Sequence, residues 1–223
     1  MKRVTIFAGH YGSGKTNVAV NYALEIAKKG HKTSLSDLDI VNPYFRSKDS
    51  EAVLKDAGIR FISSEYANSN VDVPALPAEA YAVTQDKESY AVVDVGGDDR
   101  GALALGRYVP DIIAENNYEM LMVVNCYRPL SRTPQDALEI MKEIEDAAKI
   151  RFTGIVNNSN IGDETTAENV LASIAYADEI SRVSGLPVVM TSVHHELFDQ
   201  LKDKIKNLFP IKLYIRQSWN VER

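Results

Sequence analysis

The stretch Gly9-His10-Tyr11-Gly12-Ser13-Gly14-Lys15-Thr16 decides how the rest of the chain is interpreted. It follows the apolar run 4–8, precedes the helix-like segment 15–29 and fits the pattern G-x-x-x-x-G-K-[ST]. In this pattern small residues let backbone N–H groups surround phosphate oxygens, the lysine ammonium reaches the terminal phosphates, and the threonine hydroxyl ligates Mg²⁺. The N-terminal end of the following helix adds positive partial charge. The sequence therefore predicts a phosphate-binding loop between a buried strand and a helix.

The composition is that of an ordinary globular protein. The 223 residues fit one α/β domain and no break in composition divides them, so we expect a single P-loop nucleotide-binding domain over residues 1–223. Hydrophobic residues make up 45% of the chain and charged residues 25%, which is enough for a well-buried core. The formal net charge of −6 disfavours a nucleic-acid-binding surface.

Cysteine content and apolar runs bear on location. Cys126 is the only cysteine, which excludes an intrachain disulfide and any cluster or zinc site built from several thiolates of one chain. No run approaches the ~18 apolar residues that a membrane-spanning helix needs, and the N-terminus enters a strand instead of a signal-peptide core. We therefore expect a cytoplasmic protein with no membrane partner.

Strands and helices alternate along the whole chain. The expected strands are about 3–8, 32–38, 59–63, 90–95, 119–125, 152–156, 186–193 and 211–215. The expected helices are about 15–29, 44–57, 78–87, 100–115, 134–149, 165–184 and 197–208, with a long loop over 64–77. This order predicts a doubly wound, mostly parallel sheet of seven or eight strands with helices on both faces, and ligands bind such sheets at the carboxyl ends of the strands.

Acidic residues occupy the ends of two predicted strands. Asp37 and Asp39 follow the second strand, and Asp94 ends the fourth strand just before Gly96 and Gly97. Carboxylates there face the phosphates, where they hold Mg²⁺ or its water and activate a water molecule, while glycines let the chain approach a γ-phosphate closely. The alternative for Asp37 and Asp39 is turn-making and helix-capping chemistry. The acidic pair 98–99 is interpreted as a cap of the next helix.

Two arginines lie in the loop after the predicted strand 119–125, on the ligand-binding side of the sheet. Arg128 and Arg132 each have the reach to contact a phosphate. Exposed charge is the default state of arginine, so the favoured interpretation is a pair of solvated loop cations.

Two features near the C-terminus suggest a metal site and a membrane-binding face, but the spacing of their residues disfavours both interpretations. The side chains of His194-His195-Glu196 diverge, and the i, i+4 histidine spacing of zinc enzymes is missing. An apolar stripe at helical spacing is usually core packing and not a membrane-binding face. The stripe consists of Leu197, Leu201, Ile205 and Leu208.

The phosphate loop, the Asp-x-Asp after the second strand and the Asp-x-Gly-Gly after the fourth strand together resemble the MinD/ParA branch of P-loop ATPases, the CobQ/CobB/MinD/ParA nucleotide-binding domain. The resemblance covers nearly the whole chain, with the three motifs in the family's order. It implies that Lys15 and Thr16 bind phosphates and Mg²⁺, and that Asp39 polarises the attacking water with Asp37 on the metal side. It also implies that Asp94, through water, and Gly97 sense the metal and the γ-phosphate.

The same resemblance implies which residues bind ATP. Asn157 or Asn158 falls where the family's base-contacting asparagine sits, and the guanine-reading Asn-Lys-x-Asp signature of GTPases is absent there, which favours ATP over GTP. The expected catalytic residues are Lys15, Asp37 and Asp39, and the expected metal-binding residues are Thr16, Asp37 and Asp94. The expected nucleotide-binding residues are Gly9, His10, Tyr11, Gly12, Ser13, Gly14, Lys15, Thr16, Asn17, Gly97, Asn157 and Asn158.

The phosphate loop departs from the family at its beginning. The family's usual loop reads Gly-Lys-Gly-Gly-x-Gly-Lys-Thr, and its first lysine crosses a dimer interface to the partner's nucleotide; His10 and Tyr11 occupy this region here. A trans lysine stabilises charge on the phosphates during transfer. Either a protonated His10 replaces it while Tyr11 packs at an interface, or both residues simply line the loop.

These observations predict a Mg²⁺-dependent ATP-binding protein that is a slow ATPase, and the resemblance implies that it couples its nucleotide state to the assembly or maturation of an unidentified protein partner. The resemblance also implies a homodimer that forms across the nucleotide. A nucleotide-binding switch with negligible turnover is one alternative. Another is an ATP-dependent ligase or kinase for a small metabolite, with the 64–77 loop as its substrate-binding surface.

Overall fold

The computed structural model describes residues 1–38, 48–63, 82–97 and 99–214. The predictions for Asp39, for Asp98 and for the 64–77 loop therefore lie outside the described residues.

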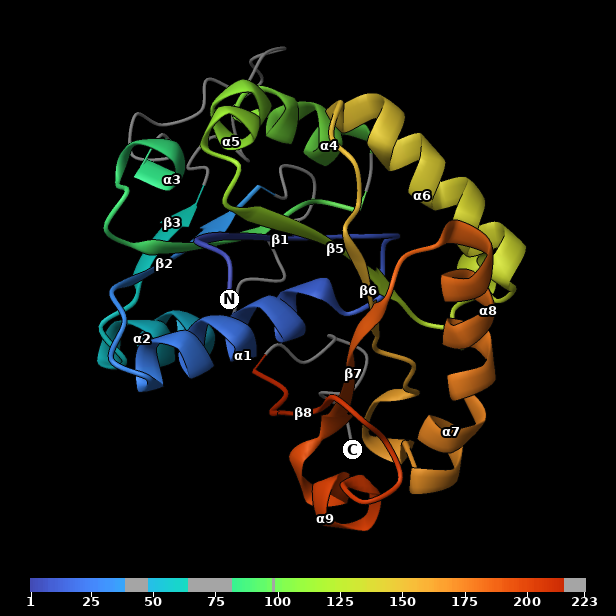
Figure 1. Ribbon diagram of the computed structural model, residues 1–223. Coiled ribbons are helices and arrows are strands. Elements are labelled where there is room, and N and C mark those ends of the chain that lie inside the picture. The colour runs from blue at the N-terminus through green and yellow to red at the C-terminus, as the bar shows by residue number, and fades with distance from the viewer. Residues whose placement is uncertain (39–47, 64–81, 98, 215–223) are drawn as a thin grey trace.

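One sheet of eight parallel strands forms the centre of the described part of the chain (Figure 1). The strands are β1 Val4–Ala8, β2 Thr33–Asp37, β3 Arg60–Ser63, β4 Tyr90–Asp94, β5 Tyr118–Val124, β6 Gly154–Asn157, β7 Val188–His194 and β8 Leu208–Ile211. Their order across the sheet is β3-β2-β4-β1-β5-β6-β7-β8, and every pairing is parallel. The predicted doubly wound α/β fold is confirmed, and the order reverses at β1, which is where such sheets bind ligands.

Helices cover both faces of the sheet (Figure 1). They are α1 Lys15–Lys28, α2 Lys48–Asp56, α3 Ala82–Gln85, α4 Asp99–Gly106, α5 Val109–Glu115, α6 Pro134–Ala148, α7 Ala167–Ala172, α8 Ile174–Ser184 and α9 Phe198–Leu201. Helices α1 and α2 lie against one face, and α4, α5, α6 and α8 lie against the other. The central strands are therefore buried on both sides, which explains the mainly apolar sequences of β1, β4 and β5.

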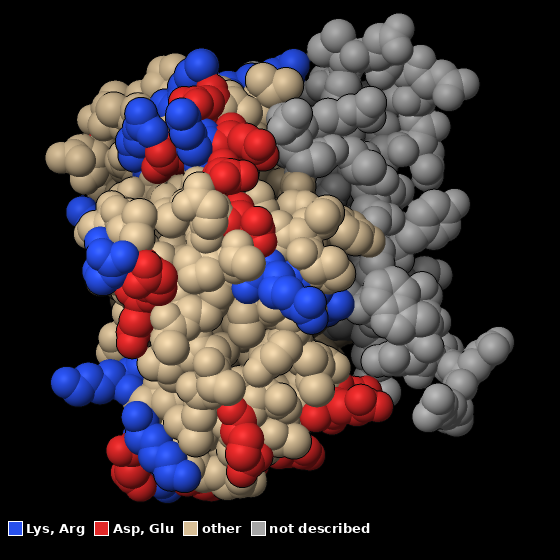
Figure 2. All heavy atoms as spheres, turned by 90° about the vertical axis from the view of Figure 1, so that its right-hand side faces the viewer, with Lys and Arg blue, Asp and Glu red and all other residues tan. Residues whose placement is uncertain are grey.

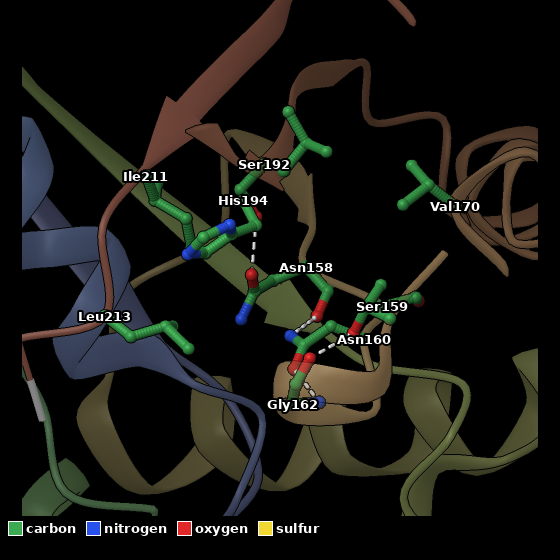
Figure 3. A pocket seen from close by; sticks show the side chains of 11 residues that line it. Asn158, Ser159, Asn160, Gly162, Val170, Ser192, His194, Ile211 and Leu213 are labelled. Atoms are coloured by element: carbon green, nitrogen blue, oxygen red, sulfur yellow. Dashed lines mark hydrogen bonds between the residues drawn. The ribbon is translucent and has the colours of Figure 1, made fainter. Parts of the chain in front are cut away.

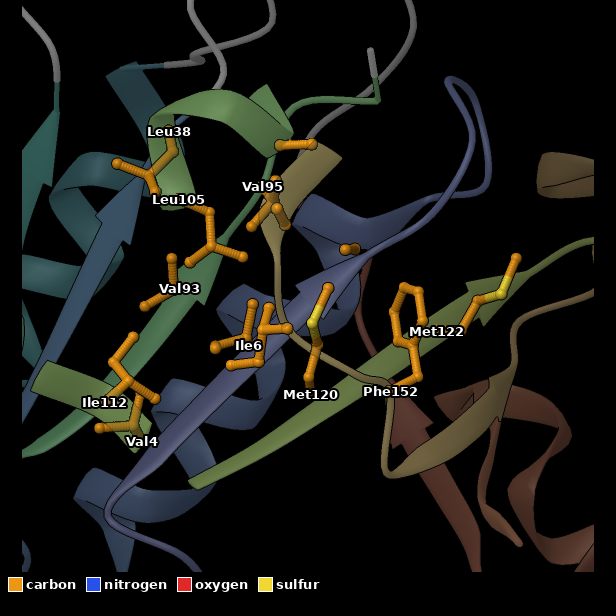
Figure 4. Close-up of a cluster of buried hydrophobic side chains, with 14 of the residues drawn as sticks. Val4, Ile6, Leu38, Val93, Val95, Leu105, Ile112, Met120, Met122 and Phe152 are labelled. Atoms are coloured by element: carbon orange, nitrogen blue, oxygen red, sulfur yellow. The ribbon is translucent and has the colours of Figure 1, made fainter. Parts of the chain in front are cut away.

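Alternate residues of each strand enter two separate hydrophobic clusters. Ile6 and Val93 belong to the larger cluster, beneath α4, α5, α6 and α8 (Figure 4), whereas Phe7 and Val92 belong to the cluster beneath α1. Successive side chains of a strand point to opposite faces, so this division follows from the two-residue period. It also places the side chain of Asp94, two residues after Val92, on the α1 face of the sheet.

A third cluster joins the far end of the sheet to α7 and α9. Leu201 and Ile205 are buried in it beside Val193, and Leu197 and Leu208 pack against it. The interpretation of the apolar stripe as core packing is confirmed. Within the described ranges, no helix combines the length and apolar character needed to cross a membrane.

Three expected helices differ from the observed ones. The helix expected over 100–115 is two helices, α4 and α5; α5 begins at Val109 after the buried Tyr108, with Pro110 in its first turn, where proline is favoured. The helix expected from about 165 begins at Ala167, where Thr166 and Asn169 form a capping box, because the Thr165 hydroxyl donates to the carbonyl oxygen of Gly162 instead. The remainder of that segment divides into α7 and α8 at Ser173.

The helix expected over 197–208 is also wrong. Only α9 is helical, and strand β8 begins at Leu208 instead of at Ile211. Pro210 lies within β8, which suits an edge strand because an edge position does not require every backbone N–H.

A buried arginine fastens the amino edge of the sheet. Arg3 donates from its guanidinium to the Glu115 carboxylate and to the carbonyl oxygens of Val83, Asp86 and Ser89. These bonds engage the five N–H donors that arginine has. Hydrogen bonds from Arg3 lower the pKa of Glu115 to about 2, helped by Lys87. This network connects β1 to the segment before β4 and to α5, at the edge opposite the phosphate loop.

Charge is mixed on the face that α6 and α8 form. Figure 2 shows lysine, arginine, aspartate and glutamate interspersed over this side of the molecule. Some of them pair locally, such as Arg182 with Glu179 on α8 and Arg151 with Glu145 near the end of α6. Exposed pairs of this kind contribute little to stability.

Candidate functional site

The phosphate loop connects β1 to α1 at the carboxyl edge of the sheet, and its glycines are required by geometry. Gly12 and Gly14 have φ angles of 79° and 86°, which favour glycine. A Cβ on Gly14 would lie 2.3 Å from Nδ2 of Asn158, and one on Gly9 would lie 2.4 Å from the carbonyl oxygen of Val123. The loop is thus pressed against the ends of β5 and β6.

The Lys15 side chain folds back onto this loop. Its Nζ atom donates to the carbonyl oxygen of His10 at 3.1 Å, and only 8% of the residue is exposed. Helix α1 begins with Gly14 as its N-cap and has no side-chain cap there. Thr16 follows in the first turn of α1, half-buried. Together these groups provide the ammonium and the helix N-terminus that phosphate binding uses.

Two buried carboxylates lie side by side next to the loop. Asp37 and Asp94 are Cα partners in the parallel pair β2 and β4, and Asp94 is also the partner of Phe7 in β1. Residues in register on neighbouring strands point to the same face and lie about 4.8 Å apart. That face is the one that α1 covers. Asp37 is 8% and Asp94 3% exposed.

This arrangement fits magnesium. Mg²⁺ prefers oxygen ligands, keeps several waters, and is usually bound through one or two carboxylates together with substrate phosphates. Asp37, Asp94 and the Thr16 hydroxyl are oxygen donors of this kind. Within the described ranges no cluster of three or more histidine, cysteine or acidic residues has the arrangement of a self-contained metal site. The residues present therefore suit an ion that is held jointly with phosphates.

The segment after β4 touches the phosphate loop. A Cβ on Gly97 would lie 2.6 Å from the backbone nitrogen of Tyr11 and 3.0 Å from Nζ of Lys15. Glycine at this position allows the closest possible approach of the two segments. The structure thus brings together the two motifs that the sequence linked to the γ-phosphate.

The adjacent asparagines after β6 point to different places. Asn158 donates through Nδ2 to the carbonyl oxygen of Ser13 at 2.6 Å and accepts a hydrogen bond from the Ser192 hydroxyl at 2.5 Å. Asn157 instead donates to the Ser173 hydroxyl at 2.9 Å, beside the start of α8. Of the two candidates, Asn158 is the one that contacts the phosphate loop.

A pocket opens beside Asn158, between the ends of β6, β7 and β8 (Figure 3). It has an empty volume of about 350 Å³, part of which is open to solvent. Polar side chains from the β6 and β7 ends face apolar side chains across it. The lining residues are Asn158, Ser159, Asn160, Gly162, Thr165, Val170, Ser192, Val193, His194, Ile211 and Leu213. None of these described lining residues is acidic.

Two asparagines of α1 hold the chain that follows β8. Asn21 exchanges two hydrogen bonds with the backbone of Lys212, at 2.8 and 2.9 Å, and Asn17 accepts from the backbone nitrogen of Tyr214 at 3.0 Å. These bonds place Leu213 at the pocket. Sequence reasoning missed Asn21 and Ser192. The i, i+4 spacing of Asn17 and Asn21 on one helix face was the available signal.

The beginning of the phosphate loop is held locally. His10 donates through Nδ1 to the carbonyl oxygen of Tyr11 at 2.8 Å, because a carbonyl only accepts, and Tyr11 is 50% exposed. The roles that the sequence predicted for these two residues stay predictions.

The two loop arginines and the histidine pair that the sequence singled out have different surroundings. Arg128 lies next to Gly12 of the loop and is partly buried, whereas Arg132 is exposed. The expected divergence of the side chains in His194-His195-Glu196 is wrong: the two histidine rings lie 4.5 Å apart, and Nδ1 of His194 is 3.6 Å from the Glu196 carboxylate.

Neither a protein-family model nor a curated protein sequence matches the chain. Solved structures do match. Cell division protein FtsY from Thermotoga maritima has a TM-score of 0.59 at 20% identity, with 85% of this chain and 61% of that chain covered. Chloroplast FtsY from Physcomitrella patens gives 0.54 at 18% identity, covering 86% and 58%. The signal recognition particle receptor FtsY from Elizabethkingia anophelis in complex with GDP gives 0.51 at 17% identity, covering 86% and 57%.

The chain has the P-loop nucleotide-hydrolase fold. At these identities the likeness extends to the fold alone, and the chain spans about three fifths of the length of the structures it matches. The expected membership of the MinD/ParA branch is wrong, because the matching structures reported above are FtsY proteins. The loop position that characterises the MinD/ParA branch holds His10 and Tyr11 here, and the motifs that do agree serve general phosphate and magnesium chemistry.

Proposed function

We propose that this protein binds a purine nucleoside triphosphate with Mg²⁺ and hydrolyses it slowly. The observation that carries the proposal is the convergence, at the end of β1, of the Lys15 ammonium, the paired carboxylates of Asp37 and Asp94, and the close approach of Gly97 to the loop. Phosphoryl transfer depends mostly on positioning and charge stabilisation, so such a set of groups is sufficient without a covalent intermediate.

Each group has a role in this proposal. Backbone N–H groups of the loop and Lys15 bind the phosphates, and Thr16 and Asp37 hold the ion, with Asp94 acting through water. Bound Mg²⁺ would neutralise charge that develops on phosphate oxygens. The role of Asp39 in orienting water stays a prediction. The segment at Gly97 would respond to the terminal phosphate, because it lies against Lys15 and Tyr11 and would move when a bound phosphate displaces either residue.

The pocket beside Asn158 is the proposed base site. Guanine has N–H groups that commonly donate hydrogen bonds to a carboxylate. The described residues that line the pocket include no aspartate or glutamate, which favours ATP. The specific observation that favours GTP is the GDP bound in a matching FtsY structure. Competition between ATP and GTP for the same site, measured by isothermal titration calorimetry, distinguishes the two.

Three biological uses of nucleotide binding are proposed, and each requires a different kinetic behaviour. Slow hydrolysis coupled to assembly or maturation of a protein partner requires turnover that the partner accelerates. A switch with negligible turnover requires tight binding without product in single-turnover assays. A ligase or kinase requires nucleotide consumption that rises only with a metabolite. The homodimer across the nucleotide and the cytoplasmic location stay predictions.

Loss of the Lys15 ammonium is the direct test. We expect Lys15→Ala to abolish detectable binding of Mg²⁺ and nucleotide together, and Asp94→Asn to weaken the Mg²⁺ dependence of binding while the fold persists in circular dichroism. Full Mg²⁺-dependent turnover by Lys15→Ala would refute the proposed function.

A further inference from the structure

We propose that Arg128 is a phosphate-binding residue of this site and that its guanidinium contacts the phosphate chain of the bound nucleotide above Gly12. The inference rests on the proposed function and adds a second cation to Lys15. Sequence reasoning favoured a solvated loop cation at this position, and the structure places the side chain differently.

The Arg128 side chain lies against the phosphate loop. A Cβ on Gly12 would be 3.8 Å from both Cδ and Nε of Arg128. Contact with a glycine backbone leaves the polar head of the side chain at the loop surface, where loop N–H groups would surround an anion. Arg132, four residues later, is exposed and serves as the solvated comparison.

The head group carries an unused donor. Nε of Arg128 is buried, and within the described residues it has no hydrogen-bond partner. No carboxylate of the described ranges forms a salt bridge with Arg128 either. A buried charged donor without a partner is costly, and an anion on the loop would remove that cost.

The turn that carries Arg128 is rigid. Its backbone nitrogen donates to the carbonyl oxygen of Asn125 at 3.2 Å, and its carbonyl oxygen accepts from the backbone nitrogen of Ser131 at 3.2 Å. The Ser131 hydroxyl donates to the carbonyl oxygen of Asn125 at 2.9 Å, and the Tyr176 hydroxyl donates to the carbonyl oxygen of Ser131 at 2.7 Å. Because the backbone of this turn is already fixed, no backbone ordering is needed when Arg128 binds a ligand.

The same turn is attached to the proposed base pocket. The fully buried Asn125 side chain accepts from the backbone nitrogens of Tyr127 and Asn160 and donates to the carbonyl oxygen of Asn160. Asn160 lines the pocket. The turn that carries Arg128 is therefore fixed in position relative to both the phosphate loop and the pocket. This is the arrangement expected of a residue that contacts one ligand bound across the loop and the pocket.

Arginine suits this role chemically. Its planar guanidinium binds phosphate oxygens through two parallel hydrogen bonds and keeps its charge at all physiological pH values. Lysine would supply charge without the paired geometry. The ligand class that this arrangement favours is a nucleoside diphosphate or triphosphate.

The test compares matched variants by isothermal titration calorimetry with ATP and with GTP in the presence of Mg²⁺. We expect Arg128→Met to weaken binding at least tenfold and to reduce its salt dependence, because one phosphate contact is lost. Arg132→Met should bind within twofold of the wild type. Arg128→Lys should recover part of the loss, which a purely structural role of Arg128 would not predict.

The outcomes separate the two proposals. Failure of the wild type to bind either nucleotide would overturn the proposed function and this inference together. Wild-type binding with equal affinity in Arg128→Met, or an equal loss in Arg132→Met, would overturn this inference alone. Should Arg128→Met fail to fold, Arg128→Gln, which keeps a polar side chain, is measured in its place, with thermal unfolding as the check of its fold.

Discussion

Replacement of Asn158 by alanine removes the connection between the phosphate loop and the end of β7. Asn158 is 3% exposed, and its amide joins the Ser13 carbonyl to the Ser192 hydroxyl. The Ser192 hydroxyl keeps a second acceptor, the carbonyl oxygen of Asn157 at 3.4 Å, so only the Ser13 carbonyl loses this partner outright. Alanine also leaves space where Nδ2 packs against Gly14.

The expected magnitude follows from these contacts. A buried polar group without its partner costs about 1–3 kcal/mol, and the small cavity adds to it, so we expect Asn158→Ala to lower the free energy of unfolding by about 2–3 kcal/mol. We expect nucleotide affinity to fall about tenfold, or about 1.4 kcal/mol, because the loop no longer has a fixed position on the sheet. Urea denaturation measures the first quantity and calorimetric titration the second.

Asn157→Ala is the matched control. Asn157 is fully buried, is the same residue type and also makes hydrogen bonds at both ends of its amide, to the Ser173 hydroxyl and from the Ser159 backbone. It should lose similar stability and keep nucleotide affinity within twofold. Equal affinity losses in the two variants would refute the assignment of Asn158 as the anchor of the loop.

Three further changes test other parts of the structure. Gly97→Ala forces a Cβ to within 2.7 Å of the Tyr11 backbone and should weaken nucleotide binding at least tenfold, measured by calorimetric titration. Gly106→Ala is the control, because the nearest atom to its added Cβ would be 3.7 Å away, and it should leave the affinity unchanged. Unchanged affinity in Gly97→Ala would contradict the proposed effect of this contact. Arg3→Met should lower the free energy of unfolding in urea by about 3–5 kcal/mol with unchanged affinity, because three carbonyl oxygens lose this donor and Glu115 keeps Lys87 alone among its described partners; a loss below about 1 kcal/mol would argue against this. The folded pKa of Glu115 is about 2 against 4.5 unfolded, so its contribution is complete above pH 4.5 and disappears as pH falls toward 2. After allowance for screening at the exposed Lys87 partner it amounts to about 1–2 kcal/mol, and Glu115→Gln should flatten urea stability over this window.

The sequence predicted the elements that have a strong period or a strong motif. Strands β1, β4 and β5 are mainly apolar runs, and the loop after β1 has glycines at positions where a Cβ would clash or φ is positive. Carboxyl ends of parallel strands share one edge of the sheet, which is why Asp37 and Asp94 could both be placed at the ligand-binding edge, whereas their pairing in register came from the structure.

What the sequence could not predict depends on contacts between distant segments. Thr165 and Thr166 are equally good caps in sequence, and the choice between them is made by the turn at Gly162. Asn157 and Asn158 are chemically identical, and only the pleat of β6 decides which one meets the loop. The family resemblance failed for a related reason, since phosphate chemistry fixes the motifs while branches of the fold differ elsewhere.

The bonds from Asn21 to Lys212 and from Asn17 to Tyr214 join one of the first segments of the chain to one of its last. A ribosome makes the phosphate loop some two hundred residues before Leu213, a wall of the pocket. Until that segment reaches α1, the nascent chain has a loop for phosphates and no complete place for the rest of a ligand. Capture of nucleotide would then follow the docking of this segment on α1, and a change that releases the segment from Asn17 and Asn21 would open one wall of the pocket.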